Sequence, residues 1–111
     1  PHVDAADLRA LDVFCREHFI EFTPSFTCFG HLGRILSLPA YRHLAEVEFP
    51  APSWVAATWL QRLRGATLYS RDPAAQDLLR RILDEFLPCF TAPRFNLCGD
   101  ETHDLGKRHP H

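Results

Sequence analysis

Several features that mark particular protein classes are missing from this sequence. Its 12 basic residues are outnumbered by 14 acidic ones, and the net charge of −2 leaves no basic field that would attract nucleic acid. No apolar run approaches the ~20 residues that a membrane-spanning helix needs. No basic segment followed by an apolar one marks a secretory signal. The first residue is proline, which is typical of a processed or cut chain.

The sequence also lacks the paired cysteine spacing of a zinc ribbon. Its four cysteines are irregularly spaced and form no C-x-x-C motif. Four cysteines allow three disulfide pairings, but each lies among apolar neighbours, so we expect reduced, buried thiols. Reduced thiols and the lack of a visible signal favour a cytoplasmic location. The four residues are Cys15, Cys28, Cys89 and Cys98.

What the sequence does have is the composition of a folded domain. A length of 111 residues predicts one domain, and 46% hydrophobic with 23% charged residues is ordinary for a globular protein. Two helices are clearly indicated. Residues 4–17 carry an apolar stripe at helical spacing behind Asp4, a good capping residue. Residues 73–87 carry a wide apolar face behind Asp72, and proline follows at the first helical position.

Short apolar runs between and after these two helices predict strands. The three runs are residues 19–22, 66–70 and 95–98. Shorter helices are indicated after residue 31, and Ser53 could cap a further helix over residues 54–64. Strands that alternate with helices are typical of parallel sheets with crossover helices. We therefore predict an α/β fold with about three parallel strands.

The stretch most indicative of function is residues 94–101, RFNLCGDE. Its apolar members predict a short buried strand, and they are Phe95, Leu97 and Cys98. Gly99 would let the chain turn tightly without a Cβ clash. Asp100 and Glu101 would then lie together where the sheet ends, which is where α/β folds place their chemistry. The plain alternative is a strand followed by a polar loop.

A histidine earlier in the chain is a second candidate for a functional role. His31 follows Gly30 just beyond the first predicted strand, so its side chain could face a site there. A hydrogen-bonded structural histidine is the plain alternative. The remaining histidines near the end of the chain, His103, His109 and His111, lie in a polar tail and are predicted to be solvated.

Several stretches together resemble a known family. Residues 20–24 (IEFTP), 29–31 (FGH) and 41–45 (YRHLA) are similar to the segment that ends in a Gly-His pair in hexosaminidase-type glycoside hydrolases of family 20 and their bacterial relatives. Residues 94–106, RFNLCGDETHDLG, resemble the same family's strand with its Asp-Glu pair. The likeness runs from the first helix to Gly106, and its most specific part is the Asp-Glu strand followed by Asp-Leu-Gly.

The resemblance implies a (β/α)8 TIM barrel that removes terminal N-acetylhexosamine residues from glycans and needs no cofactor. Residues 1–111 would be a single segment of that barrel, with residues 46–66 as an irregular insertion. Glu101 would be the general acid that protonates the glycosidic oxygen. Asp100 would orient the substrate's own acetamido group, which acts as the nucleophile, and His31 would line the sugar pocket. An adjacent anion and partial burial would raise the pKa of the acid.

The sequence also departs from that family. A full barrel takes ~250 residues, and the strands that carry the family's sugar-binding arginine, pocket tryptophans and acetamido-holding tyrosine have no counterpart here. Cys98 stands where many members have glycine. We therefore expect the 111 residues alone to show no measurable turnover and to self-associate through exposed strand edges.

Two other functions fit the same residues. One is a non-catalytic sugar-binding or regulatory remnant of the same fold, which a chromogenic N-acetylglucosaminide assay would separate from an enzyme. The other is a metal-dependent hydrolase that uses His31, Asp100, Glu101 and His103. This alternative is the weakest, because no two histidines are spaced as ligands on one helix face around an acid. Stoichiometric zinc or manganese after purification would favour it.

Overall fold

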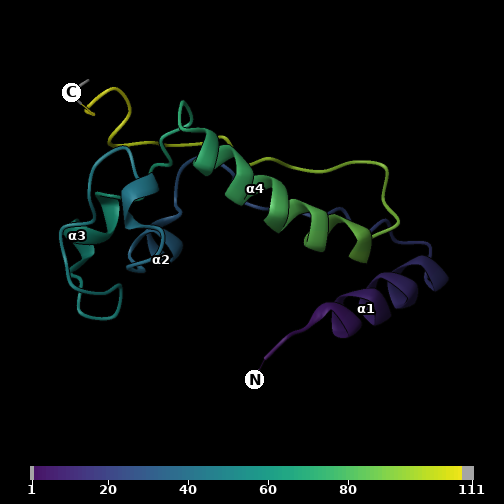
Figure 1. The fold of residues 1–111 in the computed structure, drawn as a ribbon. Helices are drawn as coiled ribbons and strands as arrows, with labels where there is room; N and C mark the ends of the chain where they lie inside the picture. Colours follow the sequence, from purple (N-terminus) through teal and green to yellow (C-terminus); the bar gives the residue numbers. More distant parts are fainter. Residues whose placement is uncertain (1, 109–111) are drawn as a thin grey trace.

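The computed structural model describes residues 2–108, and its regular structure is helical (Figure 1). Figure 1 shows α2, α3 and the C-terminal segment gathered at one end of the molecule, with α1 at the other end. Within the described range, none of the helices has the length and apolar character that a membrane crossing requires. His109 and His111, predicted to be solvated, lie outside this range. The elements are α1 (Ala5–Glu17), α2 (Gly33–Leu36), η1 (Arg42–Leu44), α3 (Trp59–Leu63), α4 (Pro73–Phe86) and η2 (Leu87–Cys89).

Both long helices begin where the sequence predicts. In α1 the Asp4 carboxylate accepts hydrogen bonds from the backbone N–H groups two and three residues on, and the Asp7 carboxylate accepts one from the Asp4 N–H. In α4 the Asp72 carboxylate caps the first turn and Pro73 follows it. Both predictions are confirmed. A helix cap can be predicted from the sequence because it depends on residues within one turn of each other.

The third helix is shorter than the sequence predicts. The pattern indicates a helix over residues 54–64 capped by Ser53, but α3 covers only Trp59–Leu63. Thr58 is its cap, since the Thr58 hydroxyl accepts from the Gln61 N–H and the Gln61 side chain accepts from the Thr58 N–H. Ser53 instead accepts a hydrogen bond from the N–H three residues on, within a turn. That turn delays the start of the helix.

The predicted α/β fold is wrong for the residues that the structure describes. Residues 2–108 contain no β-strand and no sheet, so they are not a TIM-barrel segment with parallel strands and crossover helices. Two isolated bridges each include one residue of a predicted strand, and the predicted strand over residues 19–22 takes part in neither. Ser25 pairs with Asn96 in the parallel sense, and Ala45 pairs with Leu68 in the antiparallel sense.

Backbone conformation stops these pairings from growing into strands. Pro24 has no N–H to donate to a ladder. His31 and Cys98 have left-handed φ values of 57° and 47°, outside the range of a strand. The segment around residue 97 is also less buried than predicted. Leu97 is 58% exposed, so it does not pack into a core as a buried strand residue would. The apolar runs at residues 66–70 and 95–98 are therefore extended segments whose few backbone hydrogen bonds to neighbouring segments do not build a strand.

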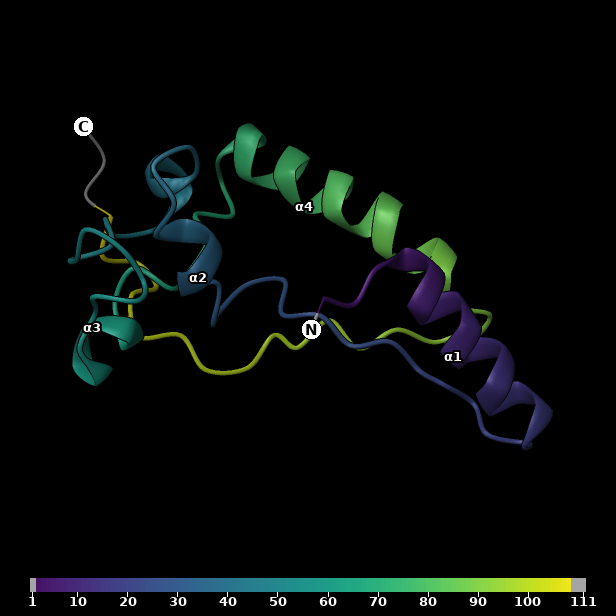
Figure 2. The same ribbon diagram turned by 90° about the horizontal axis from the view of Figure 1, so that it is seen from below.

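Two of these extended segments run side by side and in the same direction (Figure 2). They are residues 20–28 and residues 94–98. Near their start, the Arg94 guanidinium donates two hydrogen bonds to Glu21 Oε1, at 3.0 and 2.9 Å. The Thr23 hydroxyl donates to the same oxygen at 3.0 Å. This ion pair joins the two segments 73 residues apart in the chain.

A row of phenylalanine rings joins the first segment to α4. Phe26 lies against Phe86 with ring centroids 5.9 Å apart, Phe86 meets Phe90 at 4.9 Å, and Phe90 meets Phe22 at 5.3 Å. Tilted and edge-on pairs at such distances are favourable beyond the apolar area that they bury. The row therefore holds residues 20–28 along α4 without a sheet.

The main core lies where α2 and the first half of α4 meet the bridge between Ala45 and Leu68. The face of α4 that the sequence predicts to be apolar is the face that packs here, so this prediction is confirmed. Each fully buried leucine contributes ~1.5–3 kcal/mol of transfer free energy. The buried members of the core are Leu32, Leu36, Leu44, Ala45, Leu68, Ala75 and Leu78.

A smaller cluster organises the stretch that the sequence leaves irregular, residues 46–66. Phe49 is buried with two alanines, and Trp54 packs against it with ring centroids 6.1 Å apart. The same tryptophan fills the space in front of Gly33, where a Cβ would lie 2.4 Å from its ring. Residue 33 therefore has to be small for this cluster to lie on α2.

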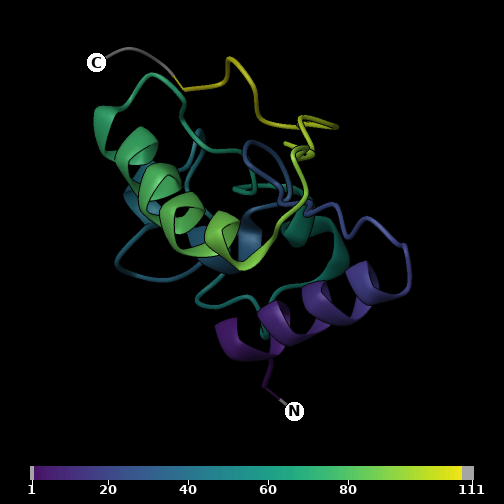
Figure 3. The ribbon, with the colours of Figure 1, turned by 90° about the vertical axis from the view of Figure 1, so that its right-hand side faces the viewer.

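Helix α1 is attached more loosely than α4. Its apolar residues Leu11 and Phe14 stay exposed, whereas its buried side chain is Asp12, whose carboxylate accepts from the Thr91 N–H at 3.1 Å and hydroxyl at 2.8 Å. Figures 1 and 2 show α1 away from the α2 end of the molecule, and Figure 3 shows α1 (purple) and α4 (green) as two separate rods. The described chain measures 51 × 29 × 23 Å, and its radius of gyration of 16.0 Å exceeds the ~13 Å of a compact domain this size.

Replacing Glu21 with glutamine should change how stability depends on pH. The hydrogen bonds from Arg94 and Thr23 lower the pKa of Glu21 from its ordinary 4.5. A carboxyl with a lowered pKa in the folded state stabilises the protein above the pKa of the unfolded chain, and this is lost as the pH falls through the lowered value. The difference in unfolding free energy between wild type and Glu21→Gln should therefore be full near neutral pH and shrink below pH 4.5.

Urea unfolding at several pH values measures this difference. Glu17→Gln is the matched control, because Glu17 is exposed at the end of α1 and forms no ion pair with the described residues. This variant removes a carboxylate without removing an ion pair, so it should not lose a stabilising contribution below pH 4.5 as expected for Glu21. Parallel curves for the two variants would contradict a stabilising role of the pair between Glu21 and Arg94.

Candidate functional site

The candidate site lies where the two parallel extended segments end. The Asn96 N–H donates to the Pro24 carbonyl at 3.0 Å, the Phe26 N–H to the Asn96 carbonyl at 3.1 Å, and the Cys28 N–H to the Leu97 carbonyl at 3.1 Å. Because both segments run in the same direction, the residues that follow them emerge at the same end. Those residues are His31 on one segment and Asp100 and Glu101 on the other.

Gly30 brings the two segment ends into contact. A Cβ at residue 30 would lie 2.4 Å from the carbonyl oxygen of Glu101 and 2.9 Å from that of Asp100. Side chains do not tolerate backbone atoms at those distances, so only glycine allows this approach. The sequence indicates Gly30 as the partner of His31, but it gives no sign that this glycine packs against the acidic pair.

The structure brings all three predicted site residues together. His31 Nε2 lies 3.5 Å from Asp100 Oδ2 and 3.9 Å from Glu101 Oε2. Adjacent residues on a regular strand point to opposite sides, so both carboxylates can face one nitrogen only because the backbone has left the strand conformation. At 3.5 and 3.9 Å these contacts are longer than good hydrogen bonds, so the carboxylate oxygens keep room for another partner.

The residue that redirects the chain is Cys98 and not Gly99. Cys98 has φ of 47°, and its N–H donates to the Asn96 side-chain carbonyl at 3.1 Å, which closes a side-chain turn. Gly99 is absent from the residues with positive φ, and a Cβ there would meet nothing within 4 Å. The prediction that Gly99 supplies the turn is therefore wrong. His31, with φ of 57°, is a second left-handed residue at the site, and such strain is common where function requires a fixed side chain.

Two cysteines lie beside this turn, and all four cysteines of the described chain are free thiols. The Cys98 sulfur lies 2.9 Å from the Ser25 hydroxyl oxygen, across the parallel pair. Burial, and to a smaller degree the nearby Cys98, raises the pKa of the Cys28 thiol above its ordinary 9.0. Cys28 is therefore a weak nucleophile at neutral pH, and the site holds no activated cysteine at that position.

A buried carboxylate fixes the loop that follows the acidic pair. Asp104 is 1% exposed, and its Oδ2 accepts a hydrogen bond from the Gly65 N–H at 2.6 Å. Gly65 has φ of +65°, and a Cβ there would lie 2.5 Å from the Cα of Phe49, so no other residue fits. The loop that begins at Glu101 is thus tied to a backbone position that is itself tightly constrained.

A second buried carboxylate holds the same loop from the other side. Glu46 is buried, and its Oε1 accepts from the Gly106 N–H at 2.9 Å. In the sequence, Asp104 belongs to the Asp-Leu-Gly motif, but nothing indicates its role. Nothing in the sequence singles out Glu46. The partner of each acid is far away in the sequence, so only the fold reveals that these two residues position the loop.

The candidate site is open to solvent. The side chains of His31, Asp100 and Glu101 are 41%, 61% and 76% exposed. The partial burial predicted for the acid is therefore not observed. Among residues 2–108, no three side chains of His, Cys, Asp or Glu are placed to hold a metal ion, so the metal-dependent alternative at His31, Asp100, Glu101 and His103 gains no support.

No protein-family model matches this chain, and no curated protein or solved structure matches it either. What the site can do follows from its side chains and their placement. Two carboxylates and an imidazole face one point, from which they can donate protons, accept protons and bind hydroxyl or amide groups.

Substituting alanine for Gly30 should separate His31 from the acidic pair. The new Cβ would meet two backbone carbonyl oxygens, so the segment ends must move apart at a cost of ~1–3 kcal/mol in unfolding free energy. Nuclear Overhauser contacts between the His31 ring and the Glu101 side chain should then weaken or vanish. Gly99→Ala is the matched control, since its Cβ points into open space. Loss of the contacts in both variants, or in neither, would contradict the role given to Gly30.

Proposed function

We propose that His31, Asp100 and Glu101 form the acid-bearing part of a glycosidase site for terminal N-acetylhexosamine residues. The observation that carries this proposal is the convergence of both carboxylates on one ring nitrogen, 3.5 and 3.9 Å away. The three residues come from two stretches separately similar to the hexosaminidase-type hydrolases. A resemblance by chance would give no reason for those stretches to meet.

The chemistry assigns each residue a task. Glu101, the more exposed acid, donates a proton to the glycosidic oxygen as the bond to the leaving group breaks. The substrate's acetamido oxygen attacks the anomeric carbon and forms a cyclic intermediate, which gives retention without an enzyme nucleophile. The Asp100 carboxylate accepts a hydrogen bond from the acetamido N–H and stabilises the positive charge that develops there. Glu101, now ionised, takes a proton from the water that opens the intermediate.

His31 binds rather than reacts in this scheme. Its Nε2 lies 3.5 and 3.9 Å from the two carboxylates, which is too close for a hydroxyl group to lie between them, but the solvent-facing side of all three groups is open. A sugar hydroxyl placed there would bond to the ring and to one carboxylate. The left-handed backbone at Cys98 also supports the proposal, because glycine, the residue many members of the family carry there, adopts it without strain.

A second function is favoured by one observation, which is the openness of the site. Side chains that are 41% to 76% exposed do not exclude water, and glycosidases gain from a site that does. A non-catalytic sugar-binding site needs no such enclosure. The carboxylates and the imidazole would then hold the sugar hydroxyls without protonating the glycosidic oxygen.

Glu101→Gln and Asp100→Asn should fail in different ways. Loss of the proton donor should cost roughly 10²–10⁴ in rate on a substrate with a poor leaving group. A nitrophenyl leaving group needs little protonation, so it should restore much of the rate in Glu101→Gln. Asp100→Asn disturbs the acetamido nucleophile, so the same substrate should not restore it. Steady-state hydrolysis of alkyl and nitrophenyl N-acetylglucosaminides measures both effects.

The assay should use this chain and a longer protein that contains it, because we expect no measurable turnover from the 111 residues alone. Asp84→Asn, on the exposed side of α4, is the control and should behave as wild type. Equal rescue of the two site variants would contradict the division of tasks. Saturable binding of N-acetylglucosamine without hydrolysis in the longer protein would favour the sugar-binding alternative.

A further inference from the structure

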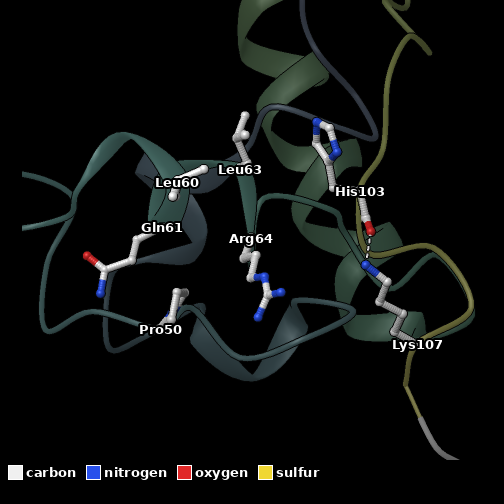
Figure 4. Close-up of a pocket in the computed structure, with 7 residues that line it drawn as sticks. All are labelled: Pro50, Leu60, Gln61, Leu63, Arg64, His103 and Lys107. Carbon is white, nitrogen blue, oxygen red and sulfur yellow. Dashed lines mark hydrogen bonds between the residues drawn. The ribbon is translucent and has the colours of Figure 1, made fainter.

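A second feature, separate from the three site residues, is a cavity of about 450 Å³ between α3 and the loop after Glu101 (Figure 4). We call it the basic pocket. One wall carries Arg64 together with apolar side chains from residues 50–63, and the other carries His103 and Lys107. Figure 4 shows the charged ends of Arg64 and Lys107 on facing sides of this space.

The two walls of the basic pocket are tied together at its edge. The hydrogen bond from the Gly65 N–H to Asp104 joins the residue after Arg64 to the residue after His103. The Lys107 ammonium donates to the His103 carbonyl and lies 3.7 Å from Asp104 Oδ1, which fixes its side chain at the rim. The backbone of both walls is therefore fixed by a buried hydrogen bond, and the Lys107 ammonium is held in place before any ligand arrives, which lowers the entropy cost of binding.

The charges of the pocket leave one cation unmatched. The Asp104 carboxylate lies 3.7 Å from the Lys107 ammonium, and this ion pair offsets one positive charge. Arg64 forms no ion pair with any residue in the range 2–108, so its guanidinium is free to bind a ligand. A guanidinium presents paired donors that match a planar or tetrahedral oxyanion. A group with a single negative charge therefore fits the pocket better than a dianion.

An apolar surface adjoins these cations. Leu60 is exposed at the pocket, and Leu63 and Pro50 line it as well. Apolar side chains beside a free cation suit a ligand that has a ring or chain next to its charged group. We propose that the basic pocket binds a monoanionic oxyanion, a sulfate ester or a carboxylate, carried on a ligand with an apolar face. This site is independent of the proposed glycosidase activity.

Titration of the full chain with 4-nitrophenyl sulfate and with benzoate, followed by amide chemical shifts, tests the proposal. At least one anion should give saturable shifts at residues 60–65 and 103–107, with Kd in the millimolar range, ~1 mM. The anion that binds more tightly identifies the oxyanion class. Arg64→Gln and Lys107→Gln should each weaken binding about tenfold, because each removes a charge-assisted hydrogen bond. Neutral benzyl alcohol should bind far more weakly.

Arg9→Gln is the control, because Arg9 is an exposed arginine on α1, away from the pocket, and this variant should bind as wild type does. Circular dichroism establishes that each variant is folded, and Lys107→Gln carries the test if Arg64→Gln is not. The proposal is overturned if neither anion gives saturable shifts, if benzyl alcohol binds equally, or if both folded pocket variants retain wild-type affinity. None of these results depends on whether the protein hydrolyses a sugar.

Discussion

The hydrogen bond between the Gly65 N–H and the buried Asp104 carboxylate is the constraint on which both sites depend. A buried carboxylate is stable only if it has polar or charged partners. The partners of Asp104 are the Gly65 N–H and the Lys107 ammonium group. The glycine cannot be replaced without displacing Phe49. The bond therefore fixes the middle of the loop from Glu101 to Lys107 against residue 65. It anchors the loop that leads away from Glu101, and it joins the two walls of the basic pocket.

Signals within a few residues of each other predict the long helices, whereas contacts between distant parts of the chain decide whether extended segments pair as strands. Asp4 and Asp72 cap α1 and α4 as predicted because a cap involves residues within one turn. The apolar runs at residues 66–70 and 95–98 predict strands equally plainly. A strand, however, needs a partner along its whole length, and the backbone at Cys98 leaves the extended range before one can form. Extended conformation was predictable, but pairing was not.

The sequence likewise indicates the residues of the candidate site but not the residues that position them. His31, Asp100 and Glu101 stand out because each follows an apolar run and lies next to a glycine or an acid. Their mutual approach could be predicted only through the family resemblance. The residues that position them could not be predicted, since Gly65 and Asp104 are 39 residues apart and Glu46 and Gly106 are 60 apart. No spacing rule relates positions at such separations.

Because α1 is loosely attached, the free energy needed to open it is lower than that needed to unfold α4 and the main core. The Asp12 carboxylate and its Thr91 partner are a small buried contact, and the helix's apolar residues add little to it. Phe19, two residues after the end of α1, is 99% exposed in a left-handed conformation that is unfavourable for a bulky residue. α1 can therefore open as a unit while α4 and the main core stay closed. Its amide protons would exchange with solvent first, and the junction at Phe19 is where a protease would first cut the native chain.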